Sequence, residues 1–201
     1  MLTNPGPYRN QLFVNTGYNL SFANYSLGWF HKEHLNFLKR DVISILDFSF
    51  PITQNFYTKF VFRKGLQTDI WQDSLWRIPI AIVGSSDKVI THLFRIHDFV
   101  TDMFLNPGIY RPRYTLALDL DYRVIWFSHY KQTNADPKPL PDQPHHIRSQ
   151  VAVGVALGLN HKRFTYLLRS GYQQSTDEEA NPYSFYAVLQ LGYNCNFKKR
   201  K

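Results

Sequence analysis

Apolar and polar residues alternate with a period of two along much of this chain. The pattern is clearest over residues 114–130, YTLALDLDYRVIWFSHY. Its even positions from Tyr114 to Trp126 are all apolar or aromatic, whereas most odd positions as far as Arg123 are polar. A period of two places successive side chains on opposite faces of a β-strand. The stretch therefore predicts one long strand with an apolar face and a polar face.

Shorter stretches with the same alternation recur along the chain, separated by pieces rich in turn-forming residues. Together with 114–126 they predict about nine strands; the others lie at 11–22, 38–50, 56–64, 76–83, 89–96, 151–159, 163–172 and 184–197. Pro79 falls inside one of them, which suggests a bulge or the rim of a sheet. The only short helix we expect lies within HDFVTDMFLNPG, residues 97–108. Turns are predicted at PITQ, GSSDK, NPGIYRP and QQSTDEEANP.

A closed bacterial barrel with both chain ends on one side needs an even number of strands. We therefore expect eight or ten strands, with the miscounted strand in 11–36 or in 88–105. The sequence predicts an all-β protein, an antiparallel up-and-down β-barrel that spans a membrane. It forms a single domain over residues 1–201, with an N-terminal extension at 1–10, a long proline-rich loop at 131–146 and a basic tail at 198–201.

Three features favour lipid over a protein core as the neighbour of the apolar faces. The strand from Tyr114 to Trp126 spans about 40 Å at ~3.3 Å per residue, which crosses a roughly 25 Å apolar band when tilted by about 45°. Aromatic residues flank its leucine-rich centre, as in the interfacial girdles of membrane barrels. A narrow barrel interior suits small residues, and these occupy the minor face of 151–159 at Ala152, Gly154, Ala156 and Gly158.

The end of the chain, QLGYNCNF at residues 190–197, supplies the fourth feature. It resembles the C-terminal β-signal of bacterial outer-membrane barrels, with Gln190, Gly192 and Phe197 at the defining positions and Cys195 where an apolar or aromatic residue is usual. The resemblance implies recognition by the barrel-assembly machinery. Many such proteins end at the aromatic residue, whereas here KKRK follows; a short basic tail is similar to barrels of the Bacteroidota.

If the apolar faces meet lipid, the polar faces line the lumen. A barrel of eight to ten strands has room for side chains but hardly for a wide channel, and isolated charges there would be costly. We therefore expect an ion-pair network that fills the lumen and is no transport path. Its predicted members are Lys59, Arg63, Arg77, Asp119, Asp121, Arg123 and Arg169.

Composition agrees with this picture but adds little to it. Charged residues make up 19% and aromatic residues 16%, which suits an aromatic-rich β protein. No run approaches the roughly 18 apolar residues of a membrane-spanning helix. The start resembles no signal peptide, so we expect either a cytoplasmic chain or a mature product whose presequence has been removed. The barrel hypothesis requires the second, in the outer membrane of a Gram-negative bacterium. The net charge of +8 suits anionic lipid, and without a recognisable motif we expect no nucleic-acid partner.

Candidate chemistry is sparse. The single cysteine, Cys195, excludes an internal disulfide and the usual zinc sites. His31 and His34 would converge on a helix but not on a strand, so we expect no metal and no cofactor. Ser128 and His129 at a strand end resemble part of the motif of lipid A deacylases, whose serine lies two residues after the histidine. That position holds Lys131, so His129 is the one candidate base and we expect no catalytic residue beyond it.

Three functions remain open at this stage. The first is a non-catalytic outer-membrane barrel with a filled lumen, acting as an accessory or scaffold subunit of a larger cell-envelope complex. Its expected partners are outer-membrane lipids including lipopolysaccharide, the barrel-assembly machinery and other envelope subunits. The second is a lipid A-modifying acyl hydrolase in the same membrane. The third is a soluble, lipocalin-like barrel that binds an apolar ligand.

Overall fold

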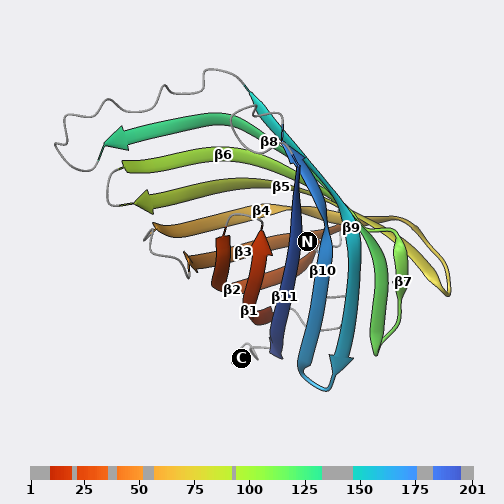
Figure 1. Cartoon of the computed structure of the whole chain (residues 1–201). Coiled ribbons are helices and arrows are strands. Elements are labelled where there is room, and N and C mark those ends of the chain that lie inside the picture. Colours follow the sequence, from red (N-terminus) through yellow and green to blue (C-terminus); the bar gives the residue numbers. More distant parts are fainter. Residues whose placement is uncertain are drawn as a thin grey trace, which may run out of the picture.

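The computed structural model describes residues 10–19, 22–35, 40–51, 57–91, 94–132, 147–175 and 183–195. These residues form one antiparallel sheet (Figure 1). Its strands are β1 (Asn10–Asn19), β2 (Phe22–Leu35), β3 (Arg40–Pro51), β4 (Tyr57–Gln72), β5 (Trp76–Thr91), β6 (Phe94–Leu105), β7 (Gly108–Tyr110), β8 (Tyr114–Gln132), β9 (Arg148–His161), β10 (Phe164–Ser175) and β11 (Tyr183–Cys195). The sheet closes on itself because β1 pairs with β11 and β4 pairs with β5.

Strands β6 and β7 share one position in this barrel. Both pair with β5 on one side and with β8 on the other. They are separated by Asn106 and Pro107, and a proline cannot donate a hydrogen bond to the ladder. The fold is therefore a closed, antiparallel barrel of ten strand positions, which confirms the predicted all-β barrel.

The structure also shows where the strand count was wrong. The region 11–36 contains two paired strands, β1 and β2. The predicted strand at 89–96 is wrong, because this stretch holds the end of β5 and the start of β6. The short helix predicted within 97–108 is wrong as well. There β6 buries Val100, Asp102 and Phe104 on the lumen face, and this mixture of apolar and acidic residues hid the alternation.

The predicted turn at GSSDK is also wrong, since residues 84–88 lie inside β5 and pair with β4 and β6. The small and polar residues of this stretch suggested a turn. In the barrel they continue the alternation of inward and outward side chains, with Ser85 and Asp87 buried in the lumen and Lys88 exposed outside.

A bulge in β8 changes which residues face outward. Phe99 of β6 pairs with Phe127, but its neighbour Val100 pairs with Ile125, so Trp126 is an extra residue. An inserted residue turns the rest of the strand to the opposite face. Trp126 and Phe127 are consequently both exposed, at 56% and 54%. This explains the apolar residue at the odd position 127; Ile125 lies before the bulge and pairs with Val100 of the lumen face.

A second irregularity confirms the prediction made from Pro79. Asp69 of β4 pairs with Pro79, but Trp71 pairs with Ile78, so Ile70 is an extra residue in β4. The bulge lies opposite the proline, as expected where a ladder donor is missing.

The two ends of the barrel differ in their connections. The start of β1 and the end of β11 lie at the same end as the turns 73–75, 111–113 and 162–163, and we call this the short-turn end. The opposite end carries the connections 20–21, 52–56, 92–93, 133–146 and 176–182, and we call it the long-loop end after the last two. At the turn 73–75, Asp73 accepts hydrogen bonds of 2.6 Å from the amides of Leu75 and Trp76, which hold the pKa of its carboxyl group below its usual range.

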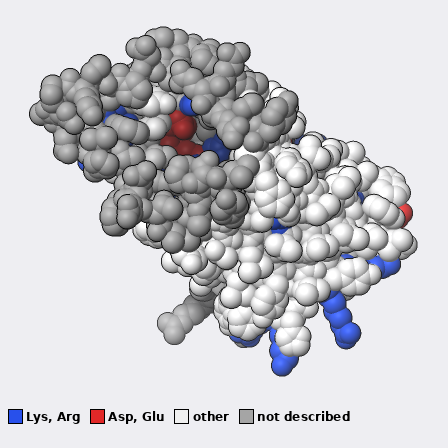
Figure 2. Space-filling model, viewed as in Figure 1, with Lys and Arg blue, Asp and Glu red and all other residues white. Residues whose placement is uncertain are grey.

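Burial in this barrel is reversed relative to a protein with an apolar core. Outward side chains of β9 such as Val153 and Leu159 are exposed by between 45% and 62%, whereas Asp87 and Asp119 in the lumen are 0% exposed. On the face seen in Figure 2, the described part of the outer wall shows few charged atoms above the basic side chains at the short-turn end, while acidic and basic atoms are visible inside the barrel at the long-loop end. Among the described residues, no helix is long and apolar enough to cross a membrane.

Candidate functional site in the barrel lumen

Apolar side chains fill part of the lumen toward the short-turn end. This cluster, which we call the apolar plug, consists of Phe13, Phe30, Ile43, Ile45, Ala81, Val83 and Phe104. The ring of Phe13 lies against Gly28, where an added Cβ would be 2.2 Å from a ring carbon. A glycine is therefore needed for this ring to enter the lumen. Ile43 and Ile45 of β3 lie at odd positions, opposite to the apolar face predicted for 38–50, and the plug accounts for them because both are buried inside.

Neutral polar side chains form a second group between β1, β10 and β11. The Gln11 amide donates to Asn194 Oδ1 at 2.9 Å, and the Gln190 amide donates to Gln11 Oε1 at 3.2 Å. The Asn194 amide in turn donates to Thr165 Oγ1 at 2.8 Å. Gly192 faces this chain, and a Cβ there would lie 2.5 Å from the Gln11 amide nitrogen. Two of the three residues of the proposed β-signal, Gln190 and Gly192, therefore lie at this seam, while Phe197 lies outside the described residues.

Asp87 is the centre of the first charged cluster. Its carboxylate lies 3.0 Å from Lys59 Nζ and accepts a hydrogen bond from Arg123. The Ser85 hydroxyl donates to its other oxygen at 3.0 Å. These partners come from β4, β5 and β8, so the cluster ties three strand positions together and satisfies a carboxylate that has no contact with solvent.

Asp102 extends this cluster along the wall. Arg123 Nε lies 3.7 Å from Asp102 Oδ1, and Arg63 Nε lies 3.5 Å from Asp102 Oδ2. Neither Asp87 nor Asp102 was among the predicted network members. Asp87 continues the alternation of β5, and Asp102 occupies a polar position on the lumen face of β6. The sequence analysis missed both residues because it predicted a turn at GSSDK and a helix within 97–108.

Asp119 is the centre of the second charged cluster. One carboxylate oxygen accepts hydrogen bonds from Arg169 Nε at 2.7 Å and from the Tyr186 hydroxyl at 2.9 Å. The other accepts a hydrogen bond of 3.0 Å from the Asn106 amide. Arg169 also donates to Asp121 at 2.6 Å. One arginine thus neutralises two carboxylates of β8 from two strands away, which fixes β8, β10 and β11 relative to one another.

Gly154 makes room for this second cluster. An added Cβ would lie 2.3 Å from the Ser170 carbonyl oxygen and 2.5 Å from the Tyr186 hydroxyl. We expect Gly154→Ala to displace Tyr186 from Asp119 and to lower the free energy of unfolding by about 1–3 kcal/mol, as overpacking does. Urea unfolding in detergent micelles measures this. Gly84→Ala is the matched control, since its Cβ would meet only one atom, at 3.8 Å; equal effects of the two substitutions would contradict the close-packed site.

Part of the lumen is open space between β1 on one side and β8 and β10 on the other. Two adjoining cavities of about 310 and 210 Å³ share Asn15 on one side with Asp121, Arg169 and Gln173 on the other. Their lining mixes polar side chains with apolar ones such as Ala152 and Val188. Asn15 Oδ1 and Asp47 Oδ1 are buried without a hydrogen-bond partner in the protein, so the cavities suit water molecules. The arrangement is a lumen with an apolar plug, two ion-pair clusters and small wet spaces.

All seven predicted network residues are found on the lumen side. Six belong to the two clusters, and Arg77 forms a separate pair near the short-turn end. Arg77 lies 2.5 Å from Asp69 and its guanidinium carbon is 5.5 Å from the centre of the Tyr110 ring. The structure therefore does not bring Arg77 together with the others.

The candidate base His129 does not meet a serine in the structure. After the bulge at Trp126, His129 is exposed outside, whereas Ser128 is buried in the lumen and donates to Asp98 at 2.6 Å. A different serine, Ser86, lies on the outer face with its hydroxyl 2.7 Å from His97 Nε2. The main chain around Ser86 is paired with strands on both sides, so its amides are used in the ladders and do not form an oxyanion hole.

His31 and His34, for which no metal site was predicted, have different partners in the structure. His31 Nδ1 lies 2.8 Å from Asn10 Oδ1, and His34 Nδ1 lies 2.8 Å from Asp41. Within the described ranges, no group of three or more histidine, cysteine or acidic side chains could hold a metal ion. Cys195 is a free, half-buried thiol at the end of β11.

These features define a closed antiparallel β-barrel with an apolar exterior and a largely filled, polar lumen. The sequence matches no family model and no curated protein. Among solved structures the chain is similar to the NanC porin (TM-score 0.47, 11% identity, 92% of this chain and 100% of that chain covered). It is also similar to the KdgM porin, with a TM-score of 0.40 and 5% identity over 92% of this chain and 99% of that chain. A third similar structure is the transport unit of the autotransporter AIDA-I from Escherichia coli, with a TM-score of 0.42 and 8% identity over 98% of this chain and 93% of that chain. The barrel assignment rests on the strand pairing of this chain itself.

Proposed function

We propose that this protein is an integral outer-membrane β-barrel whose lumen is filled and which acts as a non-catalytic scaffold or accessory subunit of the cell envelope. The observation that carries the proposal is the reversed burial: exposed aliphatic side chains cover the wall, and paired charges fill the inside. Exposed apolar area of this extent is unfavourable in water and favourable in lipid. A soluble lipocalin-like barrel has the opposite arrangement.

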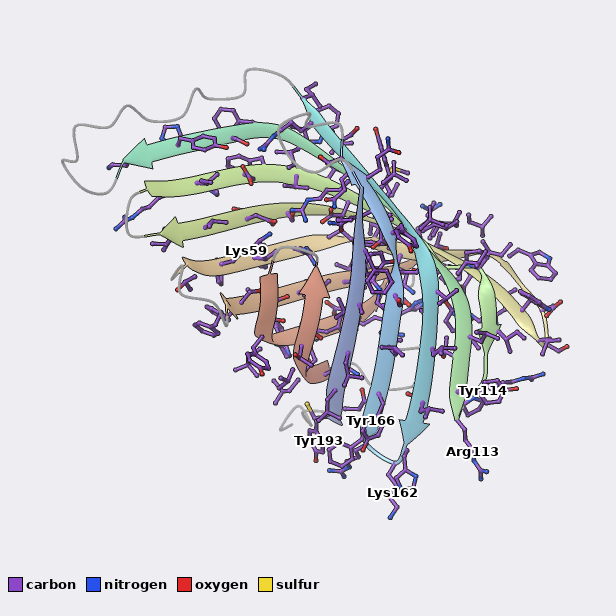
Figure 3. All side chains as sticks on the ribbon, viewed as in Figure 1. Lys59, Arg113, Tyr114, Lys162, Tyr166 and Tyr193 are labelled. Carbon is purple, nitrogen blue, oxygen red and sulfur yellow. The ribbon has the colours of Figure 1, made fainter. Side chains whose placement is uncertain are left out.

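Aromatic side chains support the same proposal because they gather near both ends of the wall. At the short-turn end, Tyr114, Tyr166 and Tyr193 lie close to the basic side chains of Arg113 and Lys162 (Figure 3). Arg163 donates a hydrogen bond of 3.1 Å to the Tyr193 hydroxyl. Exposed aromatic residues nearer the other end include Tyr25, Phe50, Trp126 and Phe127. Aromatic rings at two levels match the girdles at the two membrane interfaces.

The direction of insertion follows from the connections. Bacterial barrels have short turns on the periplasmic side and longer loops outside. The short-turn end, where β1 begins and β11 ends, is therefore assigned to the periplasm, and the long-loop end to the cell exterior.

The lumen supports a role that does not involve transport. The apolar plug and the Asp87 and Asp119 clusters occupy the space that a solute would need. We expect the purified protein to insert into planar lipid bilayers without producing single-channel currents. Phe13→Ala combined with Phe30→Ala removes two rings from the plug and should produce measurable currents. Stable channels formed by the unmodified protein would contradict the filled lumen.

The role as a subunit is tested separately. Extraction from its native membrane in mild detergent should bring other envelope proteins with this chain in a fixed ratio. A preparation that contains only this chain would contradict the subunit role while leaving the membrane barrel in place.

A further inference from the structure

Basic side chains gather on the outer wall of β5, β6 and β8 near the long-loop end. We call this surface the basic outer patch; it consists of Lys88, Arg95, His97, His129 and Lys131. In the ladders, His97 is paired with Lys88 on one side and with His129 on the other, and Arg95 is paired with Lys131. Directly paired residues point to the same face of a sheet, so the five side chains form one surface.

The bulge at Trp126 creates this surface. Without the extra residue, the alternation of β8 would turn His129 and Lys131 into the lumen. With it, both are exposed outside, next to the exposed Lys88 and Arg95. A local irregularity thus brings basic residues of three strands into register.

Among the described residues, no carboxylate neutralises the lysine and arginine charges of the patch. Within the described part of the chain, Lys88, Arg95 and Lys131 form no ion pair, whereas the lumen cations lie beside carboxylates. The neighbouring acids Asp87 and Asp98 point inward, where Lys59, Arg123 and Arg148 lie beside them. Like charges in register destabilise a sheet unless something binds between them. The patch is therefore complementary to an anionic partner.

Apolar rings border the patch on the side of the barrel centre. The Phe99 and Phe127 rings lie 5.7 Å apart, both exposed, and the Phe99 ring is 4.7 Å from His97. The Ser86 hydroxyl, 2.7 Å from His97 Nε2, helps to hold the imidazole in place. A surface with cations toward the rim and rings toward the membrane centre matches an amphiphile with an anionic headgroup and acyl chains.

We propose that the basic outer patch binds the phosphate groups of lipid A in the outer leaflet. This rests on the proposed outer-membrane location, because the long-loop end then faces the leaflet that contains this phosphorylated glycolipid. Adjacent strands are about 4.8 Å apart, so the patch extends about 10 Å across β5, β6 and β8, which suits a sugar headgroup with its phosphates. Arginine can bind a phosphate through two parallel hydrogen bonds and lysine as a point charge.

Binding of lipid A to the full chain in detergent micelles, measured by native mass spectrometry, tests the proposal. The three probes are bisphosphorylated lipid A, the same lipid after phosphate removal, and phosphatidylglycerol. The triple variant Lys88→Gln, Arg95→Gln and Lys131→Gln should bind bisphosphorylated lipid A roughly 100-fold more weakly, because each cation near an anionic lipid surface contributes a factor of about five. The charge-matched control Arg113→Gln, Lys162→Gln and Arg163→Gln at the short-turn end should bind it normally.

Each outcome decides one question. Weaker binding by the patch variant alone, together with loss of binding on phosphate removal, supports the site. Equal binding by the patch variant and the unmodified protein overturns it, as does equal binding of phosphatidylglycerol and lipid A. Insertion into vesicles of neutral lipid is measured in parallel on the same proteins. An unmodified protein that inserts but does not bind lipid A contradicts only the patch, whereas one that fails to insert contradicts the proposed membrane location.

Discussion

Arg169→Met should lower the free energy of unfolding by about 3–5 kcal/mol, the cost of removing one partner from a buried ion pair. Arg169 lies 2.7 Å from Asp119 and 2.6 Å from Asp121. Methionine fills similar space but leaves the Asp119 carboxylate, which is 0% exposed, without its cation. Denaturant unfolding in micelles, followed by intrinsic tryptophan fluorescence, measures the change.

A second substitution separates the charge from the packing. Asp119→Asn removes the buried charge while it retains a hydrogen-bonding side chain. In combination with Arg169→Met it should cost less than the sum of the two single substitutions, since the methionine then no longer faces an uncompensated carboxylate. Arg113→Met, at an exposed position of a short turn, should change stability little. Additive effects of Arg169→Met and Asp119→Asn would contradict a coupled cluster.

Leu118→Arg should lower the stability of the lipid-inserted barrel by about 2–4 kcal/mol, because it places a charge near the middle of the apolar band. Leu118 faces outward and is 50% exposed, so the substitution creates no clash in the lumen. The position lies four residues beyond the first residue of β8, about 13 Å along the strand. Folding into lipid vesicles, with heat-modifiable migration on gels as the readout, measures the effect.

The matched control is Tyr114→Arg, on the same strand and the same face but at the short-turn rim. An arginine near the interface costs only about 0–1 kcal/mol. Similar losses for Leu118→Arg and Tyr114→Arg would mean that this face of β8 does not cross lipid.

The strands of this fold were predictable wherever one face was uniformly apolar. Over residues 151–159 of β9, and in β8 as far as Arg123, the alternation runs without interruption, because the outward positions are all apolar or aromatic and the lumen positions are small or polar. In β6 the lumen face combines Val100 and Phe104 with Asp102, so the two faces look alike in hydrophobicity. Period-two reasoning fails where the inside of a barrel is itself partly apolar.

The sequence identified charged residues that line the lumen, but it could not identify which of them form ion pairs with each other. Lys59, Arg123 and Arg169 were identifiable from their place on polar faces. Their partners depend on how the sheet closes, since Arg169 reaches across β9 to the carboxylates of β8. The bulge at Trp126 was equally out of reach, because a single extra residue changes the outward face without changing the composition.

The seam between β1 and β11 determines the order in which the barrel can form. The hydrogen bond from Gln11 to Asn194 joins residues separated by 183 positions, so it requires nearly the whole chain. The neighbouring pairs within the meander close much shorter loops and form with smaller entropic cost. Until β1 meets β11, both strands are open edges that could pair with another chain. The neutral side-chain amides of Gln11, Gln190 and Asn194 join these two edges by hydrogen bonds and leave no charge to desolvate. They therefore stabilise the pairing of β1 with β11 at the last step of folding.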